Sequence, residues 1–164
     1  MKTLLILRHA KSSWNNAGVN DHDRPLNKRG KRVAPQMGRL LKDQDLVPEV
    51  IVSSTAKRAR KTAELVAENC SYLGTVEVTQ RLYHASAGEA ISVLAELDGG
   101  QACALLVAHN PGVEGLLEGL TGKVAAMPTA ALAQVELPID QWRSLSLATE
   151  GTLINLWRPR ELEE

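Results

Sequence analysis

The sequence predicts an α/β fold, built as a three-layer α/β/α sandwich with a mostly parallel central sheet and helices on both faces. Two observations predict it. Short apolar runs alternate along the chain with stretches of helical periodicity, which is the pattern of strands and helices in parallel sheets. No repeat, low-complexity tract or linker interrupts the 164 residues, so we expect a single domain over residues 1–164.

Several segments have the composition of strands. Leu4 to Leu7 is apolar throughout, which is typical of a strand that is covered on both faces. Val50 to Val52 and Ala104 to Ala108 are similar runs. The expected strands cover residues 4–7, 50–52, 76–78, 104–108, 131–137 and 152–157.

Helical periodicity fills the intervals between these strands. Asn27 is a suitable N-cap for a basic helix over about 28–43, and Pro35 within that stretch allows a later start. A second helix is expected to end near Asn69, and others to cover residues 87–97 and 112–120. The charged segment from Pro159 onward is expected to be frayed.

The charge balance argues against two classes of function. Nineteen basic residues match nineteen acidic ones, which is unusual for a general nucleic-acid binder or a polybasic membrane protein, although a local basic pocket stays open. Cys70 and Cys103 form no CxxC pair and are expected to be reduced thiols. The first apolar run is too short for a secretory signal, and no stretch approaches the roughly 18 apolar residues of a membrane span. We therefore expect a cytoplasmic protein.

Three of the expected strands end in unusual residues. Arg8-His9 follows the first strand, Ser53 to Arg58 follows the second, and His109-Asn110 follows the fourth. In open α/β sheets, ligands bind beyond the carboxyl ends of the strands. We therefore expect these three segments to meet at one edge of the sheet.

These residue types suit the transfer of a phosphoryl group, which needs positive charge around its oxygens and a nucleophile at phosphorus. Arginine donates paired hydrogen bonds to such oxygens. A neutral imidazole can attack phosphorus and hold it covalently when one ring nitrogen is unprotonated and an acceptor orients the other. Each residue alone is more often structural, and it is their convergence that favours a phosphoryl-transfer site.

Four segments resemble motifs of the histidine phosphatase superfamily. Residues 7–12, LRHAKS, resemble its LRHG(E/K)S signature, and residues 53–63, SSTAKRARKTA, resemble its SSPxxRAxxTA segment. Residues 107–110, VAHN, resemble its V(S/G/A)H(N/G) segment, and RPL at 24–26 followed by Gly30 also matches. The motifs occur in the right order over nearly the whole chain. RHAKSSW, DHDRPLNKRG and AHNPG together are most similar to the SixA-type phosphohistidine phosphatases.

The resemblance implies a phosphoglycerate mutase-like fold and a set of catalytic residues. His9 would be the nucleophile, and Arg8, Arg58 and His109 would surround the phosphate.

The resemblance also implies further substrate-binding residues. Asn15 matches a phosphate-contacting Asn of the phosphoglycerate mutase branch, Arg24 a cationic donor of the SixA-type branch, and Asn110 stands beside the second histidine. A polar loop residue and a salt-bridging arginine are the alternative interpretations of Asn15 and Arg24.

The chain departs from the family pattern at the nucleophile and at the acid. Ala10 stands where Gly is usual, and Thr55 replaces Pro. Relatives that cleave phosphoesters often carry a Glu or Asp after the third strand as general acid, but no carboxylate stands next to Leu82. His84 and Glu89 are the candidates, although Glu89 also suits the first turn of a helix. A missing acid favours a phosphoramidate substrate, because an imidazole leaving group is far less basic than an alkoxide.

The sequence therefore predicts a metal-independent phosphatase that works through a phosphohistidine intermediate, with a phosphohistidine-bearing signalling protein as partner. No cofactor is expected, and no cluster has metal-ligand spacing; His22 and Asp23 are interpreted as a solvated loop. The alternatives are a small-molecule phosphomonoesterase of the same superfamily, a phosphoglycerate mutase, and a non-catalytic phosphate-binding module on the same fold.

Overall fold

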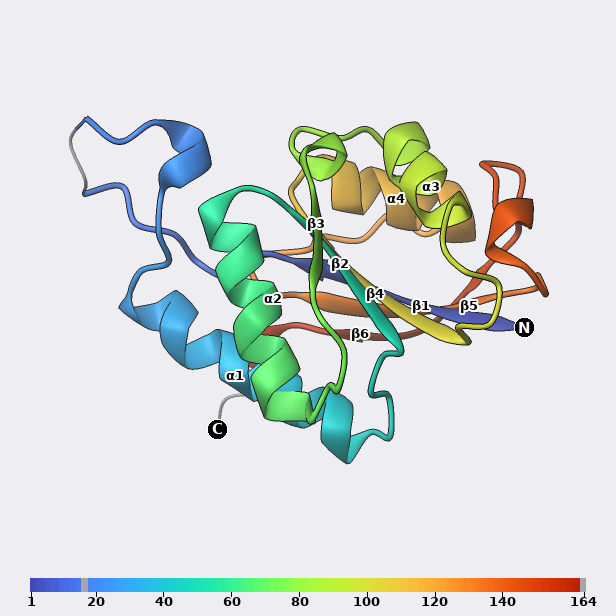
Figure 1. Ribbon diagram of the computed structural model, residues 1–164, viewed down its shortest axis with the longest axis horizontal. Coiled ribbons are helices and arrows are strands. Elements are labelled where there is room, and N and C mark those ends of the chain that lie inside the picture. Colours follow the sequence, from blue (N-terminus) through green and yellow to red (C-terminus); the bar gives the residue numbers. More distant parts are fainter. Residues whose placement is uncertain (16–17, 163–164) are drawn as a thin grey trace.

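The computed structural model describes residues 1–15 and 18–162, and its centre is a six-stranded sheet (Figure 1). The strands are β1 (Lys2–Arg8), β2 (Val50–Ser54), β3 (Glu77–Thr79), β4 (Cys103–Ala108), β5 (Leu132–Leu137) and β6 (Thr152–Trp157). Their order across the sheet is β3-β2-β4-β1-β5-β6. The first four strands of the chain pair in parallel, whereas β5 runs antiparallel to β1 and to β6. The mostly parallel sheet that the sequence predicts is confirmed.

Helices cover both faces of the sheet, which confirms the three layers (Figure 1). α1 (Lys28–Asp43) and α2 (Lys57–Cys70) pack on one face, and α3 (Ala87–Ala95) and α4 (Gly112–Thr121) pack on the other. Shorter helical elements lie in the connections. They are η1 (Asp21–Asp23), η2 (Gln80–Leu82), η3 (Trp142–Ser144) and α5 (Pro159–Leu162).

The strand β1 shows how the sequence divides the core between the two faces. Successive side chains of a strand point to opposite faces. Leu5 and Leu7 join the apolar cluster under α1 and α2, whereas Leu4 and Ile6 join the cluster under α3 and α4. All four side chains are completely buried, and each contributes about 1.5–3 kcal/mol by leaving water. The carboxyl end of β1 is therefore held firmly at the centre of the sheet.

The helix α1 begins where its N-cap predicts. The Asn27 side chain accepts a hydrogen bond from the Gly30 N–H (2.8 Å), and Pro35 lies inside the helix rather than before its start. A Cβ at Gly30 would collide with the carbonyl oxygen of Lys11. Glycine at this position therefore lets α1 lie directly against the loop that follows β1.

The C-terminal segment differs from its expectation. Residues 159–162 form the short helix α5, and Pro159 is buried. The Glu161 N–H donates to the Arg158 carbonyl (2.9 Å), and the two side chains form an ion pair (3.6 Å). These local bonds, together with the burial of Pro159, hold a segment that charge alone predicts to be frayed.

Both cysteines are free thiols, as predicted: Cys70 is buried and Cys103 is half-buried. Within the described ranges, no helix has both the length and the apolar character that a membrane crossing requires.

Candidate active site

The carboxyl ends of β1 and β4 lie side by side. The two strands pair in parallel with Arg8 opposite Ala108, so the residues that follow, His9 and His109, become neighbours. The His9 N–H donates to the Ala108 carbonyl (3.1 Å), and the two imidazole centroids are 5.0 Å apart. The register of the sheet thus brings together two histidines that are remote in sequence.

The His9 ring is held neutral, with an unprotonated nitrogen at Nε2. Its Nδ1 lies 2.7 Å from the carbonyl oxygen of Ala10. A carbonyl only accepts, so Nδ1 carries the proton and Nε2 keeps its lone pair. The side chain is buried, and burial lowers the pKa of His9 to about 4, with the backbone bond opposing this and nearby arginines adding to it. His9 is therefore unprotonated at Nε2 at neutral pH.

Thr62 of α2 fixes the backbone at the nucleophile. The Ala10 N–H donates to the Thr62 hydroxyl (2.9 Å), which in turn donates to the Arg58 carbonyl (2.6 Å). The Ala10 methyl that replaces the usual glycine is completely buried in the cluster under α1 and α2. The chain accommodates this departure from the family pattern by packing the methyl group.

His109 is held in one tautomer by Ser54 of β2. The Ser54 Oγ accepts from the Ala56 N–H (3.2 Å) and lies 2.9 Å from Nε2 of His109. In the part of the chain that the structure describes, the Ser54 hydroxyl has no other acceptor, so its hydrogen is best directed at the Nε2 lone pair, which leaves the ring proton on Nδ1. Among the described residues, the buried Nδ1 has no hydrogen-bond partner. Burial lowers the pKa of His109 to about 3, so the ring is a neutral donor with one free N–H.

Asp21 of η1 joins the cations of the site. Its carboxylate accepts from the Tyr83 hydroxyl (2.6 Å), from Nη2 of Arg58 (3.1 Å) and from Nε and Nη2 of Arg24 (3.2 and 3.1 Å). The Tyr83 hydrogen bond and then the two arginines hold the pKa of Asp21 well below its usual range. Asp21 is therefore an ionised anchor for Arg24 and Arg58.

The grip of Asp21 decides which edge of Arg58 faces the nucleophile. Nη1 of Arg58 donates to the Asp21 carbonyl (2.7 Å), while Nε points to Nε2 of His9 (3.4 Å). The guanidinium is buried although it lies in a strongly basic segment. Its Nε edge is thus aimed at the position where a phosphoryl group on His9 would lie.

Two further arginines complete the positive surroundings. Arg8 donates from Nη1 to the Met127 carbonyl (3.2 Å), and burial lowers its pKa. Arg24 is buried; it donates from Nη1 to the Ser12 hydroxyl (2.6 Å) and lies 3.5 Å from the centroid of the Trp14 ring. These contacts are to the protein itself and hold both side chains in place, so their positions are set before a substrate binds.

These side chains share one cavity of about 360 Å³. It brings together Arg8, His9, Arg24, Arg58, His109 and Asn110 among the predicted site residues. The remaining lining residues are Lys11, Ser12, Trp14, Asp21, His84 and Thr129.

Two predicted substrate-binding residues are placed differently from the rest. Asn15 is exposed and lies outside the lining; its N–H donates to the Ser13 hydroxyl (3.2 Å). Asn110 lines the cavity, but its amide donates to the Glu114 carboxylate (2.6 Å) and to the Met127 carbonyl (2.9 Å). The Asn110 amide group therefore braces the loop beside Arg8.

The two candidates for the general acid are separated by the structure. His84 lines the cavity with a positive φ of 59°, and its ring lies against Tyr83 with centroids 3.9 Å apart. Glu89 is instead the N3 residue of a capping box with Ser86 at the start of α3. Asp21 is the one described carboxylate of the lining, and it is ionised. No described cavity residue is thus a protonated carboxylic acid.

No role at the site is predicted from the sequence for Asp21, Tyr83, Ser54 or Thr62. The expected solvent exposure of His22 and Asp23 agrees with their side chains, which are 37% and 62% exposed, but His22 has a partner that the sequence does not reveal. Nε2 of His22 lies 2.9 Å from the Thr55 hydroxyl, and η1 packs against α2. The available signal was an acidic residue three positions before Arg24 in a motif that already matched the family. Within the described ranges, no group of three His, Cys, Asp or Glu residues is placed to hold a metal ion.

Comparisons with known proteins agree with this geometry. The sequence model of the histidine phosphatase superfamily (branch 1) matches residues 4–98. A structure of the protein histidine phosphatase SixA complexed with tungstate is 27% identical, with a TM-score of 0.83 over 98% of this chain and 99% of that one. An uncharacterised protein of Mycobacterium leprae is 29% identical over 160 residues, 96% of this chain and 93% of that protein. A chloroplastic protein of Arabidopsis thaliana is 43% identical over 61 residues, and this match spans 28% of its length.

Proposed function

The chain belongs to the histidine phosphatase superfamily and is a phosphatase, and from this premise we propose that it removes phosphoryl groups from histidine side chains of proteins. The SixA structure, which it matches over nearly its whole length, is that of a protein histidine phosphatase. That likeness supports a phosphohistidine-bearing signalling protein as the substrate. The covalent intermediate would form on His9.

The observation that carries the proposal is the state of the His9 ring. Its proton is held on Nδ1 by Ala10, its Nε2 is unprotonated, and the guanidinium of Arg58 lies beside that atom. Arg8 and the His109 ring line the same cavity. A neutral imidazole surrounded by fixed donors suits nucleophilic attack on phosphorus.

The cycle has two steps. In the first, the Nε2 lone pair of His9 attacks phosphorus, and the bond from phosphorus to the substrate imidazole breaks with its electron pair on nitrogen. The departing ring carries a proton on its other nitrogen, so it leaves as a neutral imidazole. In the second, water attacks phosphorus, the bond to Nε2 breaks, and both hydrogens of the water stay with the inorganic phosphate, which leaves as H₂PO₄⁻. His9 returns to its neutral form.

The charges of the cavity favour a dianion. The guanidinium groups of Arg8, Arg24 and Arg58 and the ammonium group of Lys11 are opposed by Asp21, the one described carboxylate of the lining. The net charge around the neutral rings of His9 and His109 is therefore three positive. A phosphoryl group carries up to two negative charges on its terminal oxygens, and most of the catalysis of its transfer is positioning and electrostatic stabilisation.

The lack of a protonated carboxylic acid among the described cavity residues supports the substrate class, and His84 is the one candidate acid that stays in the lining. An alkoxide needs a proton as it departs, which phosphoester hydrolysis obtains from a general acid. The Asp21 carboxyl cannot provide it, because its pKa is lowered by Tyr83 and the two arginines. A phosphohistidine releases an imidazole, which is a far better leaving group, so the cavity suits a phosphoramidate.

The test compares kcat/KM on a phosphohistidine peptide with that on an alkyl phosphomonoester for wild-type protein and His9→Asn. We expect the wild type to prefer the phosphohistidine peptide by more than about 10²-fold, since one general acid contributes about that factor, and we expect His9→Asn to lose both activities. A wild type that cleaves the alkyl ester faster would overturn the substrate class.

One observation favours a small-molecule phosphomonoesterase as the second candidate. A wider cavity of about 660 Å³ adjoins the catalytic one through Asp21. It is lined by Asn20, Asp21, His22, Thr55, Gln80 and Tyr83, polar groups that would suit the rest of a small hydroxylated ester. The same comparison of substrates separates this candidate from the first. Tight binding of vanadate without turnover of any substrate would instead indicate a non-catalytic phosphate-binding module.

A further inference from the structure

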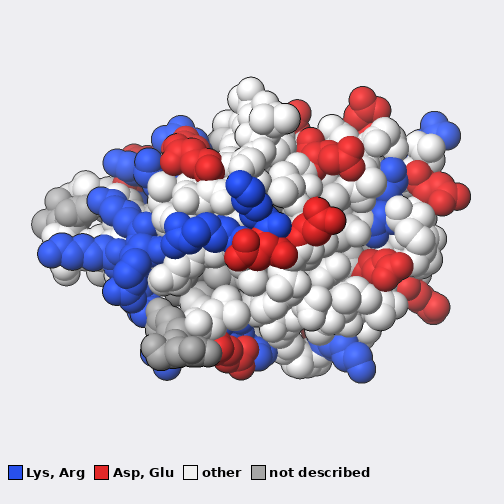
Figure 2. Space-filling model, turned by 90° about the horizontal axis from the view of Figure 1, so that it is seen from below, with Lys and Arg blue, Asp and Glu red and all other residues white. Residues whose placement is uncertain are grey.

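Charge is segregated in this neutral chain. Residues 28–42 contain no Asp or Glu, and residues 57–61 read KRARK. Figure 2, which views the α1/α2 layer from below, shows Lys and Arg side chains gathered at the end of the molecule where both helices begin. The basic residues between 28 and 42 are Lys28, Arg29, Lys31, Arg32, Arg39 and Lys42.

The start of each helix in this layer breaks a rule of helix electrostatics. Cations near a helix N-terminus oppose the macrodipole, at a cost of about 0.3–1 kcal/mol each. The first turns of α1 and α2 hold no acidic residue, whereas α3 and α4 carry Glu89 and Glu114 there. Both exceptions lie at the same edge of the sheet, and natural proteins break local rules mainly at functional sites.

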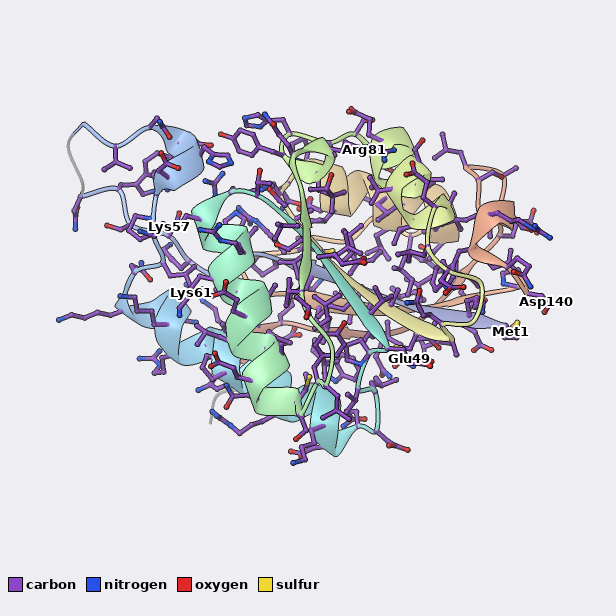
Figure 3. The ribbon with its side chains drawn as sticks, viewed as in Figure 1. Met1, Glu49, Lys57, Lys61, Arg81 and Asp140 are labelled. Atoms are coloured by element: carbon purple, nitrogen blue, oxygen red, sulfur yellow. The ribbon has the colours of Figure 1, made fainter. Side chains whose placement is uncertain are left out.

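Two of the exposed cations, Lys11 and Lys57, lie at or beside the catalytic cavity, and the others continue along α1 and α2. Lys11 lines that cavity, and its carbonyl accepts from the Asn27 N–H at the start of α1 (3.0 Å). Lys57 directly precedes Arg58, and Figure 3 shows Lys57 and Lys61 on the outer side of the first half of α2. We call this surface the basic rim; it consists of the exposed residues Lys11, Lys28, Lys31, Lys57, Arg60 and Lys61.

We propose that the basic rim docks an acidic segment of the protein that carries the phosphohistidine. The inference rests on the proposed function, since it names the chemistry of that substrate around the phosphorylated residue. The rim lies beside the cavity into which the phosphohistidine must enter, so carboxylates flanking that histidine would meet lysines. Opposite charges on two such surfaces raise the rate of encounter and weaken with salt.

The composition of the rim favours an acidic protein over a nucleic acid. Surfaces that bind single-stranded nucleic acid place aromatic side chains between their cations, because bases stack on them. The sequences of α1 and α2 contain no Phe, Tyr, Trp or His, and Trp14, the exposed aromatic residue of the cavity lining, has the Arg24 guanidinium against its ring. Lysine, a flexible point charge, suits carboxylates presented at varied angles.

Two synthetic phosphohistidine peptides of equal length test the docking. One carries four glutamates around the phosphohistidine, and in the other these are glutamines. We expect the wild type to show a kcat/KM about tenfold higher for the glutamate peptide at low salt, a ratio that falls towards one at 0.5 M NaCl. Several surface pairs of about 0.2–1 kcal/mol each give a factor of this size.

The variant Lys28→Glu/Lys31→Glu should reverse the preference to the glutamine peptide. The matched control is Lys123→Glu/Arg143→Glu, which makes the same change of charge at two exposed positions outside the basic rim. Lys123 follows the end of α4, and Arg143 lies in η3. The control should keep the preference of the wild type. Equal preference in wild type and Lys28→Glu/Lys31→Glu would overturn the proposal.

The binding of the two peptides to His9→Asn separates docking from catalysis, because the peptides stay phosphorylated. A tighter Kd for the glutamate peptide supports the rim even if turnover fails and the proposed substrate class is wrong. Equal Kd values reject the rim while leaving the proposed function standing. Competition by a uridine oligonucleotide at low micromolar concentration, without any preference between peptides, would assign the rim to nucleic acid instead.

Discussion

The two helical layers of this protein follow different rules. α3 begins with a Ser86–Glu89 capping box, and Glu114 in the first turn of α4 accepts from the Asn110 amide. α1 and α2 begin with cations, and the first turn of α2 supplies Arg58 to the catalytic cavity. The α3/α4 layer carries acidic residues in its first turns, which the helix macrodipole favours. The α1/α2 layer lacks this stabilisation and instead places positive charge near the substrate.

The difference between the two layers shows which elements hold the side chains of the site in place. Arg58 is held by Asp21 from the segment before α1, and the nucleophile loop is held by Thr62 from α2. The other layer contributes donors through loops: His109 precedes α4, and His84 lies between η2 and α3. The cationic layer therefore contributes charge and the opposite layer contributes imidazole side chains, and substitutions in the two layers should have different consequences.

The largest effect is expected for Arg58→Ala in the cationic layer. Removing a preorganised donor beside the transferred group costs about 10²–10³-fold, and more where a full charge is lost. We expect kcat/KM to fall by about 10³-fold on any phosphorylated substrate. Arg39→Ala is the control, since Arg39 is exposed on α1 and bonds Asn69 (3.3 Å). Comparable losses in the two variants would mean that Arg58 acts only on folding.

A smaller effect is expected for Ser54→Ala, which releases the tautomer of His109. We expect kcat to fall by about 10–100-fold, because the His109 ring, whose centroid lies 5.0 Å from that of His9, would no longer be held in one tautomer and orientation. Nitrogen NMR of the His109 ring gives an independent signature: the proton should be on Nδ1 in the wild type and shared between the nitrogens in the variant. Ser53→Ala is the control, since Ser53 bonds the Ser54 carbonyl (2.9 Å). An unchanged tautomer in Ser54→Ala would refute the assignment.

The pH dependence of activity and of stability follows from the neutral rings of His9 and His109. The pKa values of His9 and His109 are lowered to about 4 and about 3 by burial, so the acid limb of kcat/KM should lie near pH 4 rather than near the ordinary 6.5. Because the unfolded chain takes up these protons first, stability should fall as pH drops from 6.5 towards 4, by at most about 1.4 kcal/mol per pH unit for each ring. Urea unfolding of the wild type and His109→Asn at pH 7, 6 and 5 checks this, with a flatter dependence expected for the variant.

The smallest effect on activity is expected for Ser86→Ala in the opposite layer. Losing an N-cap costs about 1 kcal/mol of stability, while kcat/KM should stay within twofold of the wild type, since Ser86 lies outside the catalytic lining. Urea unfolding and turnover measured on the same preparation decide it. A large loss of activity without a loss of stability would show that the start of α3 contributes to catalysis, against the division between the two helical layers.

The sequence predicts this site well where strand ends carry the motif residues. Arg8, His9 and His109 follow apolar runs whose pairing places them together, and Asn27 marks the start of α1 through an ordinary cap. Asp21 and Tyr83 could not be found in this way. They are 62 positions apart, and their hydrogen bond depends on how η1 and the loop after η2 fold over α2, which no local pattern records.

Charge composition gives an incomplete picture of two polar segments. The tail is expected to be frayed, but Pro159 is buried and the local Arg158–Glu161 bonds hold α5. The His22 side chain is 37% exposed, as a solvated loop predicts, yet it contacts Thr55, 33 positions away. Asn15 shows the reverse: the resemblance gives it a role at the phosphate, while its side chain is exposed away from the cavity lining.

The most direct measurement is the location of the phosphoryl group during turnover. The protein is mixed with a phosphodonor, the reaction is quenched rapidly in base, and the phosphorylated peptide is mapped. The phosphoryl group should be found on Nε2 of His9. The label should be stable in alkali, released by acid and absent in His9→Asn. A label on any other residue, or full turnover by His9→Asn, would contradict the account.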